Sequence, residues 1–122
     1  MECPFCSEKI NTVAENDLAY AIYDKYPVSD GHILIIPKRH FSSFFDASVE
    51  ERRAMNDLLD QCKNILDDVS APHGYNIGIN CGEAAGQTIF HVHVHLIPRF
   101  TSDINDPRGG VRGVIPEKRI YE

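Results

Sequence analysis

The chain has 122 residues, of which 43% are hydrophobic and 25% are charged, and this length suits one globular domain with a single core. Its 18 acidic residues outnumber its 12 lysines and arginines, so the formal net charge is −6. This charge disfavours nonspecific binding to nucleic acid or to an anionic membrane surface, because both carry charge of the same sign.

The N-terminal segment MECPFCSEKI lacks the charged and then apolar pattern of a secretory signal, and the chain has no run of about 18 apolar residues. We therefore expect a cytoplasmic protein that does not bind a membrane. Cysteines in a reducing compartment are expected as metal ligands or buried small residues rather than as disulfides. Cys3 and Cys6 form a C-x-x-C pair, which taken alone indicates a metal half-site, a redox pair or incidental packing about equally.

Two apolar segments predict the first strands. Residues 18–23 are apolar and aromatic and are followed by a breaker-rich stretch, residues 24–31, which predicts a strand that leads into a loop. Residues 32–37 then predict a buried strand, because five of the six are apolar or Pro.

A helix is predicted to begin after Ser48. Ser48 and Glu51 have capping-box spacing, in which a hydroxyl and a carboxylate each accept a backbone N–H of the other residue. Apolar residues then recur at steps of three and four until Pro72, and they include Cys62, which we expect in the core. Cys81 receives no assignment.

The second half of the chain predicts a hairpin and an irregular arm. Residues 75–80 alternate with period two, residues 81–86 form a small-residue loop, and residues 87–98 return as the second strand. From Thr101 onward Asp, Pro, Gly and Arg are frequent, which predicts an arm, with residues 113–116 as a short edge strand. We therefore expect one domain over residues 1–122, with a core of 1–100 and a C-terminal arm of 101–122.

Histidine alternates with Val or Leu from His91 to Leu96. In an extended strand His91, His93 and His95 would share one face. A solvated polar face does not favour histidine three times over Thr, Lys or Glu, so a site is the better explanation. A metal ion bound by all three is a rival, although rings about 6.6 Å apart along a strand reach one ion only if the strand bends sharply. A row of imidazoles suits phosphate chemistry, in which one ring attacks phosphorus and its neighbours contact oxygens.

These motifs resemble the histidine triad (HIT) family of nucleotide hydrolases and transferases. His91-Val-His-Val-His-Leu-Ile resembles the family's alternating signature, Gly31-His-Ile-Leu-Ile-Ile-Pro-Lys-Arg-His40 resembles its G-H-x-L strand, and Asn80 with Gly86-Gln-Thr88 resembles the loop before the triad. The resemblance covers roughly residues 3–100. It implies an α+β, HIT-like fold with an antiparallel sheet packed with one long helix and a short one, and it implies a homodimer in which strands of two subunits extend one sheet.

The resemblance implies cleavage at the α-phosphate of a nucleotide through a covalent nucleotidyl-histidine. His93 would be the nucleophile, because a neutral imidazole attacks through an unprotonated nitrogen while the other nitrogen donates to an acceptor. That acceptor would be the backbone carbonyl of His91, and His32 would support the same network. His95, Gln87 and Thr88 would bind the α-phosphate and the leaving group. This chemistry would require no metal.

Two further polar residues would bind the substrate by the same match. Asn80 would lie near the scissile bond, and Asp24 would accept hydrogen bonds from the ribose hydroxyls, a role that its two oxygens suit. A structural role for Asp24 as a turn residue before Pro27 is the alternative.

Many bacterial members resemble this chain in having a C-x-x-C together with two further histidines that bind zinc. The resemblance implies a Cys₂His₂ site of Cys3, Cys6, His40 and His91, and such a closed site is structural because no position is left for water. Zinc would also steady His91, whose carbonyl orients His93.

Three functions remain open. The loop of residues 82–88 resembles the dinucleoside polyphosphate hydrolase branch, whereas the cysteines resemble the bacterial zinc-bearing branch, so dinucleoside polyphosphates and nucleoside phosphoramidates are both candidate substrates. The alternatives are a nucleotide-binding or sensing module without turnover, and a metalloenzyme that activates water at the histidines.

Overall fold

The computed structural model describes residues 3–7 and 12–121. The expected domain limits at residues 1 and 122, and part of the N-terminal segment in which we found no secretory signal, lie outside the described residues.

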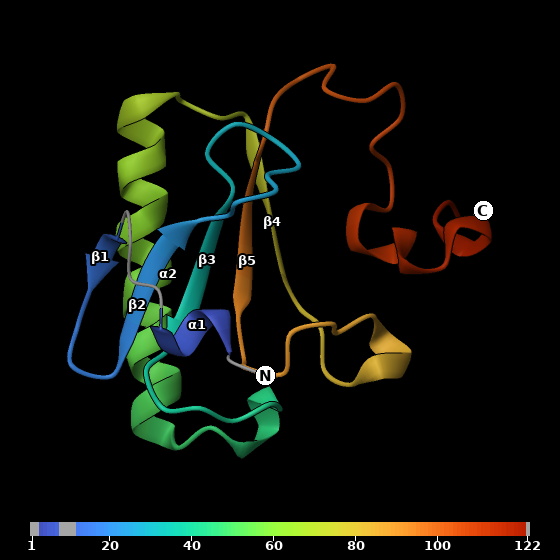
Figure 1. The fold of residues 1–122 in the computed structure, drawn as a ribbon. Coiled ribbons are helices and arrows are strands. Elements are labelled where there is room, and N and C mark those ends of the chain that lie inside the picture. The colour runs from blue at the N-terminus through green and yellow to red at the C-terminus, as the bar shows by residue number, and fades with distance from the viewer. Residues whose placement is uncertain (1–2, 8–11, 122) are drawn as a thin grey trace.

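Five antiparallel strands form one sheet in the order β1-β2-β3-β5-β4 (Figure 1). Their bounds are Thr12–Glu15 for β1, Ala19–Tyr23 for β2, Ile33–Pro37 for β3, Gly74–Ile79 for β4 and Val94–Arg99 for β5. The long helix α2, Val49–Val69, packs across β1, β2 and β3 on one face, and the short helix α1, Pro4–Ser7, lies over the other face. The predicted α+β architecture, with one long helix and one short one, is confirmed.

The capping box at the start of α2 forms as predicted. The Ser48 hydroxyl accepts the Glu51 N–H at 3.0 Å, and the Glu51 carboxylate accepts the Ser48 N–H at 2.9 Å. The apolar stripe of α2 then buries Leu58, Cys62 and Leu66 against the sheet, so Cys62 is a core residue. The helix ends at Val69, before Pro72.

β3 is buried along its whole length because both faces of the sheet are covered. Ile33 and Ile35 face α2 and belong to the main core. Leu34 and Ile36 face the other way and form a smaller apolar cluster with Phe5 of α1 and Tyr20 of β2. The alternation of side chains along a strand thus supplies one core beneath α2 and a second one beneath α1.

The last strand begins later than predicted. We expected residues 87–98 to be extended, but β5 begins at Val94, because its ladders with β3 and β4 both end there, opposite Ile35 and Ile79. Before that point the backbone N–H of Val92 donates to the carbonyl of Phe41 instead, at 2.9 Å. His91 and His93 therefore precede the strand, so the alternation of side chains between the two faces of β5 does not fix where their rings point.

The predicted edge strand at residues 113–116 is wrong. The arm contains two 3₁₀ turns there, Gly110–Val114 and Pro116–Lys118. Gly109 and Gly110 have φ of +87° and +47°, which bends the chain away from an extended path. After β5 the arm extends to the side of the sheet where β4 is the edge strand (Figure 1). Within the described part of the chain, no helix is both long and apolar enough to cross a membrane.

Candidate active site

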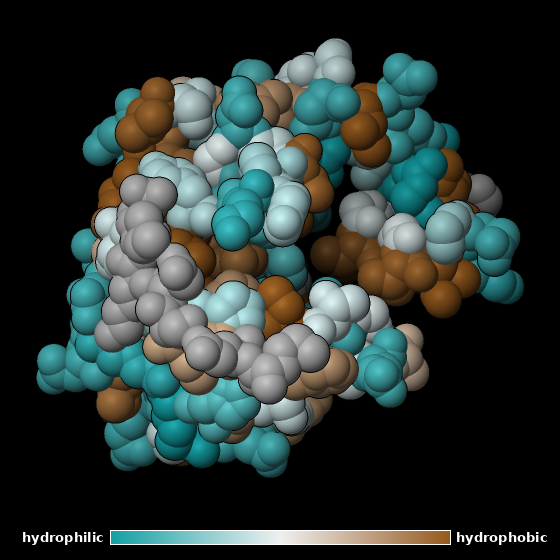
Figure 2. Space-filling model, viewed as in Figure 1, coloured by the Kyte–Doolittle hydropathy of each residue, from teal (hydrophilic) through white to brown (hydrophobic). Residues whose placement is uncertain are grey.

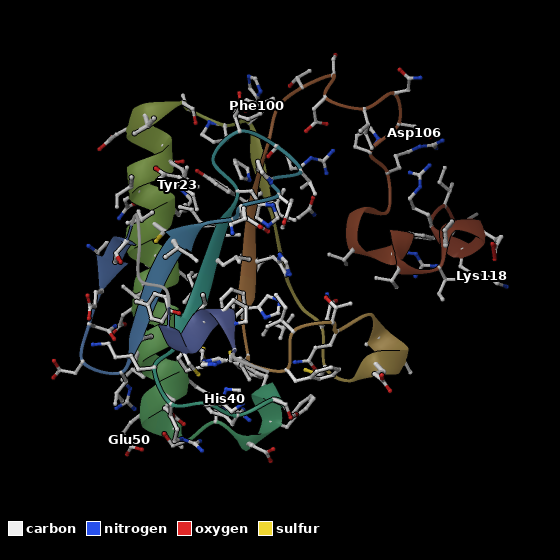
Figure 3. All side chains as sticks on the ribbon, viewed as in Figure 1. Tyr23, His40, Glu50, Phe100, Asp106 and Lys118 are labelled. Atoms are coloured by element: carbon white, nitrogen blue, oxygen red, sulfur yellow. The ribbon has the colours of Figure 1, made fainter. Side chains whose placement is uncertain are left out.

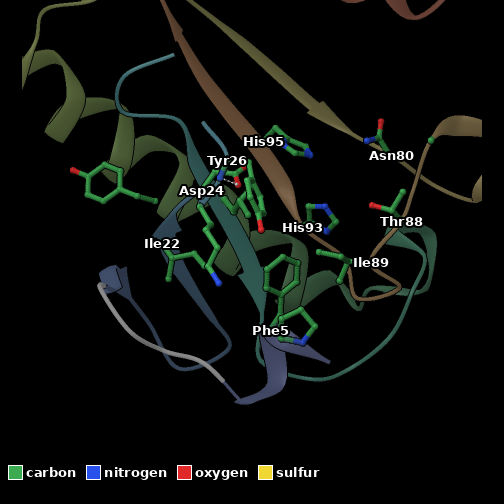
Figure 4. Close-up of a pocket in the computed structure, with 14 residues that line it drawn as sticks. Phe5, Ile22, Asp24, Tyr26, Asn80, Thr88, Ile89, His93 and His95 are labelled. Carbon is green, nitrogen blue, oxygen red and sulfur yellow. Dashed lines mark hydrogen bonds between the residues drawn. The ribbon is translucent and has the colours of Figure 1, made fainter. Parts of the chain in front are cut away.

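A pocket of about 760 Å³ opens on the face of the sheet that α1 covers. The space-filling view shows this face hollowed between the body of the molecule and the arm (Figure 2). The pocket has an apolar wall and several polar groups (Figure 4): the wall is Phe5, Ile22, Leu34 and Ile89, and the polar groups include Asp24, Asn80, Thr88, His93 and His95. Its size and mixed lining are typical of sites for small molecules.

Strand register places the apolar wall beside the histidines. Ile22 pairs with Leu34 across β2 and β3, and Leu34 pairs with His95 across β3 and β5. Paired residues of antiparallel strands point to the same face, so these three side chains form a row across the sheet. The pocket therefore changes from apolar to polar along one direction.

The ring of His93 stands between Phe5 and His95, with its centroid 5.1 Å from each of theirs. Its Nδ1 lies 2.8 Å from the carbonyl oxygen of His91. Because a carbonyl can only accept, Nδ1 carries a proton and donates, and in the neutral ring this tautomer leaves Nε2 with a free lone pair. His93 thus has the tautomer of a nucleophile.

The hydrogen bond from His32 determines which ring nitrogen of His95 carries the proton. The backbone N–H of Val28 donates to His32 Nδ1 at 3.2 Å, so the His32 proton is on Nε2, which lies 3.0 Å from His95 Nδ1. This proton makes Nδ1 of His95 an acceptor and leaves the His95 proton on Nε2. Burial lowers the pKa of His32, and burial together with the neighbouring His93 and His32 lowers the pKa of His95 to about 4. Both rings are therefore neutral at neutral pH.

Asp24 lines the pocket and also makes a turn. Its Oδ1 accepts the backbone N–H of Tyr26 at 2.9 Å, drawn as the dashed line in Figure 4, and its Oδ2 lies 3.4 Å from His32 Nε2. The structural role that we weighed against ribose binding is therefore present. The side chain nevertheless stays 15% exposed on the pocket side of the chain, so one role does not preclude the other.

Gln87, unlike Asn80 and Thr88, does not line the pocket. It is only 4% exposed, and its amide is used within the loop: Oε1 accepts the N–H of Gly82, and Nε2 donates to the carbonyls of Ser42 and Ile89. Gly82 and Gly86, both at φ +94°, give the loop its bends. Gln87 therefore shapes the loop that carries Gly86 and Thr88 to the pocket.

His91 points away from the pocket, into a cluster with Cys3, Cys6 and His40. The four potential ligand atoms all lie within 4.8 Å of one another. His91 Nδ1 is 3.4 Å from the sulfur of Cys3, 3.5 Å from that of Cys6 and 3.1 Å from His40 Nδ1. The predicted row of three rings is thus divided, with two in the pocket and His91 fully buried beside the cysteines.

The cluster fits a tetrahedral metal ion. His91 Nε2 donates to the carbonyl of Pro37 at 2.7 Å, so Nδ1 directs a lone pair at the cluster. Zn–N bonds of about 2.0 Å and Zn–S bonds of about 2.3 Å require ligand separations of roughly 3.3–3.8 Å, close to those found. Two thiols and two histidines are also the donor set of a closed structural zinc site.

The described residues contain a second group of potential ligands, Asp24, His32 and His95, and His93 belongs to neither group. The rival in which His91, His93 and His95 share one ion is therefore not formed, because His91 turns to the cysteines before β5 begins.

Phe5 is one of the lining residues that sequence reasoning missed, as it missed Pro4, Lys25, Tyr26, Leu34 and Ile89. It is 8% exposed, and its ring meets those of His93 and His91 edge-on. A signal was available, since Phe5 is the large apolar residue inside the C-x-x-C pair. Its direction into the pocket, which Figure 4 shows, depends on how α1 lies on the sheet, and Figure 3 draws the described side chains on the whole ribbon.

A family model described as the HIT domain matches residues 7–102. The chain belongs to the HIT family. Solved structures of the family agree with this fold: a zinc-bound histidine triad protein of Mycobacterium smegmatis superposes with a TM-score of 0.76 at 32% identity, over 83% of this chain and 77% of that one. A diadenosine triphosphate hydrolase of Plasmodium falciparum gives 0.75 at 27% identity, over 91% and 73%.

This HIT protein also resembles curated relatives with named activities. An AP-4-A phosphorylase of Mycobacterium tuberculosis is 35% identical over 94 residues, which are 76% of this chain and 48% of the relative. An adenylylsulfatase of Arabidopsis thaliana is 34% identical over 107 residues, which are 84% of this chain and 54% of the relative. The chain spans about half the length of these two relatives.

Proposed function

We propose that this HIT protein cleaves a dinucleoside polyphosphate or a nucleoside phosphoramidate at the α-phosphorus, through a nucleotidyl intermediate on His93. The observation that carries the proposal is the bond from His93 Nδ1 to the His91 carbonyl, which leaves Nε2 able to attack in a pocket with one apolar wall. The names of the two curated relatives and of the Plasmodium hydrolase support substrates that contain an adenylyl group.

The reaction has two balanced steps. In the first, the lone pair of His93 Nε2 forms a P–N bond, and the bond from phosphorus to the leaving group breaks with its electron pair going to the leaving group. In the second, the oxygen of a water molecule forms a P–O bond, the P–N bond breaks with its electron pair returning to His93 Nε2, and the proton lost by the water passes to solvent. Inorganic phosphate in place of water would make the same intermediate serve a phosphorolysis.

The other pocket residues have supporting roles in this proposal. His95 would donate from Nε2 to a non-bridging or leaving oxygen, and as a neutral donor it would not require protonation first. Thr88 and Asn80 would donate to the same region, and Asp24 would accept from the ribose. His32 is a positioning residue for His95. We expected Gln87 to bind phosphate, but in this proposal it positions the loop instead.

Cys3, Cys6, His40 and His91 would hold zinc, which would supply a cross-link between α1 and the segment that leads into β5. The residues of the chain, not this ion, would carry the two steps above. We also propose the homodimer, because among residues 3–7 and 12–121 β4 is the last strand of the sheet and pairs only with β5, and Ile77 on it is 49% exposed. Sedimentation of the purified protein at a mass near that of one chain would argue against it.

The test of the nucleophile is His93→Ala. We expect turnover of diadenosine tetraphosphate and of adenosine 5′-phosphoramidate to fall by about 10³-fold or more, because the variant has no imidazole at position 93 to form the P–N bond. The affinity for AMP should change by less than about threefold. Product release is measured by chromatography, and AMP binding by calorimetry.

His73→Ala is the matched control, since His73 lies outside the pocket and accepts only the N–H of Thr101 among the bonds described. Wild-type protein quenched in turnover should carry an acid-labile, base-stable nucleotide, and His93→Ala should not. Wild-type turnover in His93→Ala would refute the mechanism. Tight AMP binding with no turnover of any substrate in wild type would favour the sensing module.

A further inference from the structure

The four residues of the C-x-x-C turn point to two different sites. Cys3 and Cys6 direct their sulfurs at His91 and His40, whereas Pro4 and Phe5, which lie between them, line the pocket. The metal cluster and the pocket are therefore the two sides of one short segment.

We infer that a metal ion bound by Cys3, Cys6, His40 and His91 holds Phe5 in the wall of the pocket and so sets the affinity of this protein for the nucleotide. The inference rests on the proposed function for the identity of the ligand. The statement that the metal ion holds Phe5 in place concerns only Phe5 and the cluster, and does not depend on that function.

Phe5 is a central part of the wall. With Tyr20, Leu34 and Ile36 it forms the smaller apolar core, against which Ile22 and Ile89 pack. Three of these, Leu34, Ile22 and Ile89, line the pocket as Phe5 does. Its ring also meets His93 at an interplanar angle of 61°, with centroids 5.1 Å apart. Displacing Phe5 would therefore remove apolar surface from the pocket and release one side of the His93 ring (Figure 4).

α1 depends on contacts outside itself for its position. It is a single turn of four residues, at whose start the Cys6 N–H donates to the Cys3 carbonyl, and so short a helix is not stable alone. The Tyr20 hydroxyl donates to the Phe5 carbonyl, and the Phe5 ring packs in the small core. A further attachment is the cluster, in which Cys3 and Cys6 contact His91 and His40.

The centre of the cluster brings two imidazole nitrogens together. Nδ1 of His91 directs a lone pair at the cluster and lies 3.1 Å from Nδ1 of His40, so without a cation or a proton between them two basic nitrogens face each other. A metal ion would join all four ligands. Without the ion, these nitrogens would repel each other and the two metal–sulfur bonds to Cys3 and Cys6 would be absent. Helix α1 would then be free to move, and Phe5 with it.

A calorimetric cycle with AMP tests the effect on affinity. In zinc-loaded protein we expect Phe5→Ala to weaken AMP binding about tenfold, the scale of a lost aromatic contact. Removal of zinc with a chelator should weaken binding to wild type by a similar factor, and Phe5→Ala should then have an effect below about twofold. Phe45→Ala is the matched control, because Phe45 is 74% exposed and lies outside the pocket.

A second measurement needs no nucleotide. Nuclear Overhauser contacts between the Phe5 and His93 rings should be present in zinc-loaded protein and lost on chelation and in Cys6→Ser, while Cys81→Ser, outside the cluster, should retain them. Circular dichroism at 25 °C should show the sheet intact throughout.

Persistence of the ring contacts without metal, or unchanged AMP affinity, would overturn the inference. So would loss of the whole sheet on chelation, since the ion would then support the entire fold and not this wall. Failure of zinc-loaded protein to bind AMP, with the ring contacts still dependent on zinc, would instead overturn the nucleotide function and leave the coupling of Phe5 to the metal in place.

Discussion

His95 is a neutral donor because of where it lies. It is half-buried, and burial, followed by the neighbouring His93 and His32, lowers its pKa to about 4. His32 has its pKa lowered mainly by burial, which outweighs the opposing effect of Asp24. Each ring would therefore bind a proton in the unfolded chain at a pH where it remains neutral in the folded one.

This difference predicts a pH dependence of stability. Between pH 6.5 and about 4 the unfolded state binds more protons than the folded state, so the free energy of unfolding should fall as the pH falls through this window and should be flat from pH 7 to 8. His95→Gln, which keeps the Cys and His cluster, should reduce the slope. Urea unfolding at several pH values measures it, and an equal slope in the variant would contradict the assignment.

At the scale of elements, the start of α2 is joined to the segment that leads to His40. Glu51 accepts from Ser48 at the helix start and takes two bonds from the Arg39 guanidinium, at 2.8 and 2.9 Å. The bonds from Arg39, more than those from Ser48, lower the pKa of Glu51 to about 2. Glu51 is 5% exposed, so its loss would leave the buried end of the helix without this acceptor.

Glu51→Ala should therefore lower the free energy of unfolding by about 2 kcal/mol, and Ser48→Ala by about 1 kcal/mol. Glu50→Ala is the control, because Glu50 is in the same helical turn but exposed; it should cost less than about 0.5 kcal/mol. Thermal or urea unfolding gives these values. A loss at Glu50 as large as that at Glu51 would show that helix charge, and not the two sets of bonds, is responsible.

At the scale of the whole molecule, the Cys and His cluster joins parts of the chain up to 88 residues apart, from Cys3 to His91. A metal ion that binds only the folded chain stabilises it by mass action. Chelation should therefore lower the melting temperature, by about 5 °C or more for a domain of this size.

Differential scanning calorimetry with and without chelator checks this, with Cys81→Ser as a variant that should keep the full shift. An unchanged melting temperature together with a reversible loss of activity would point instead to a catalytic ion, for which Asp24, His32 and His95 are the second described group of potential ligands.

The sequence by itself determined the elements and the family. Hydrophobic periodicity, the Ser48–Glu51 capping box and the triad motif are local patterns, and local patterns depend on residues that are neighbours along the chain. They therefore predicted the strands and the long helix, and the resemblance that rests on them implied the antiparallel sheet and five polar residues that line the pocket, Asp24, Asn80, Thr88, His93 and His95. Strand alternation did not extend to His91, because β5 lacks a partner strand before Val94.

Only the tertiary structure decided which way His91, Gln87 and Phe5 point. His91 turns to cysteines that are 85 and 88 residues away along the chain, and Gln87 donates to the carbonyl of Ser42, 45 residues away. Phe5 reaches His93 because α1 lies on the sheet. These directions are set by contacts between distant segments, for which spacing along the chain carries no signal. The same is true of the arm, whose residues 113–116 have strand-like composition but take part in two successive 3₁₀ turns beside β4.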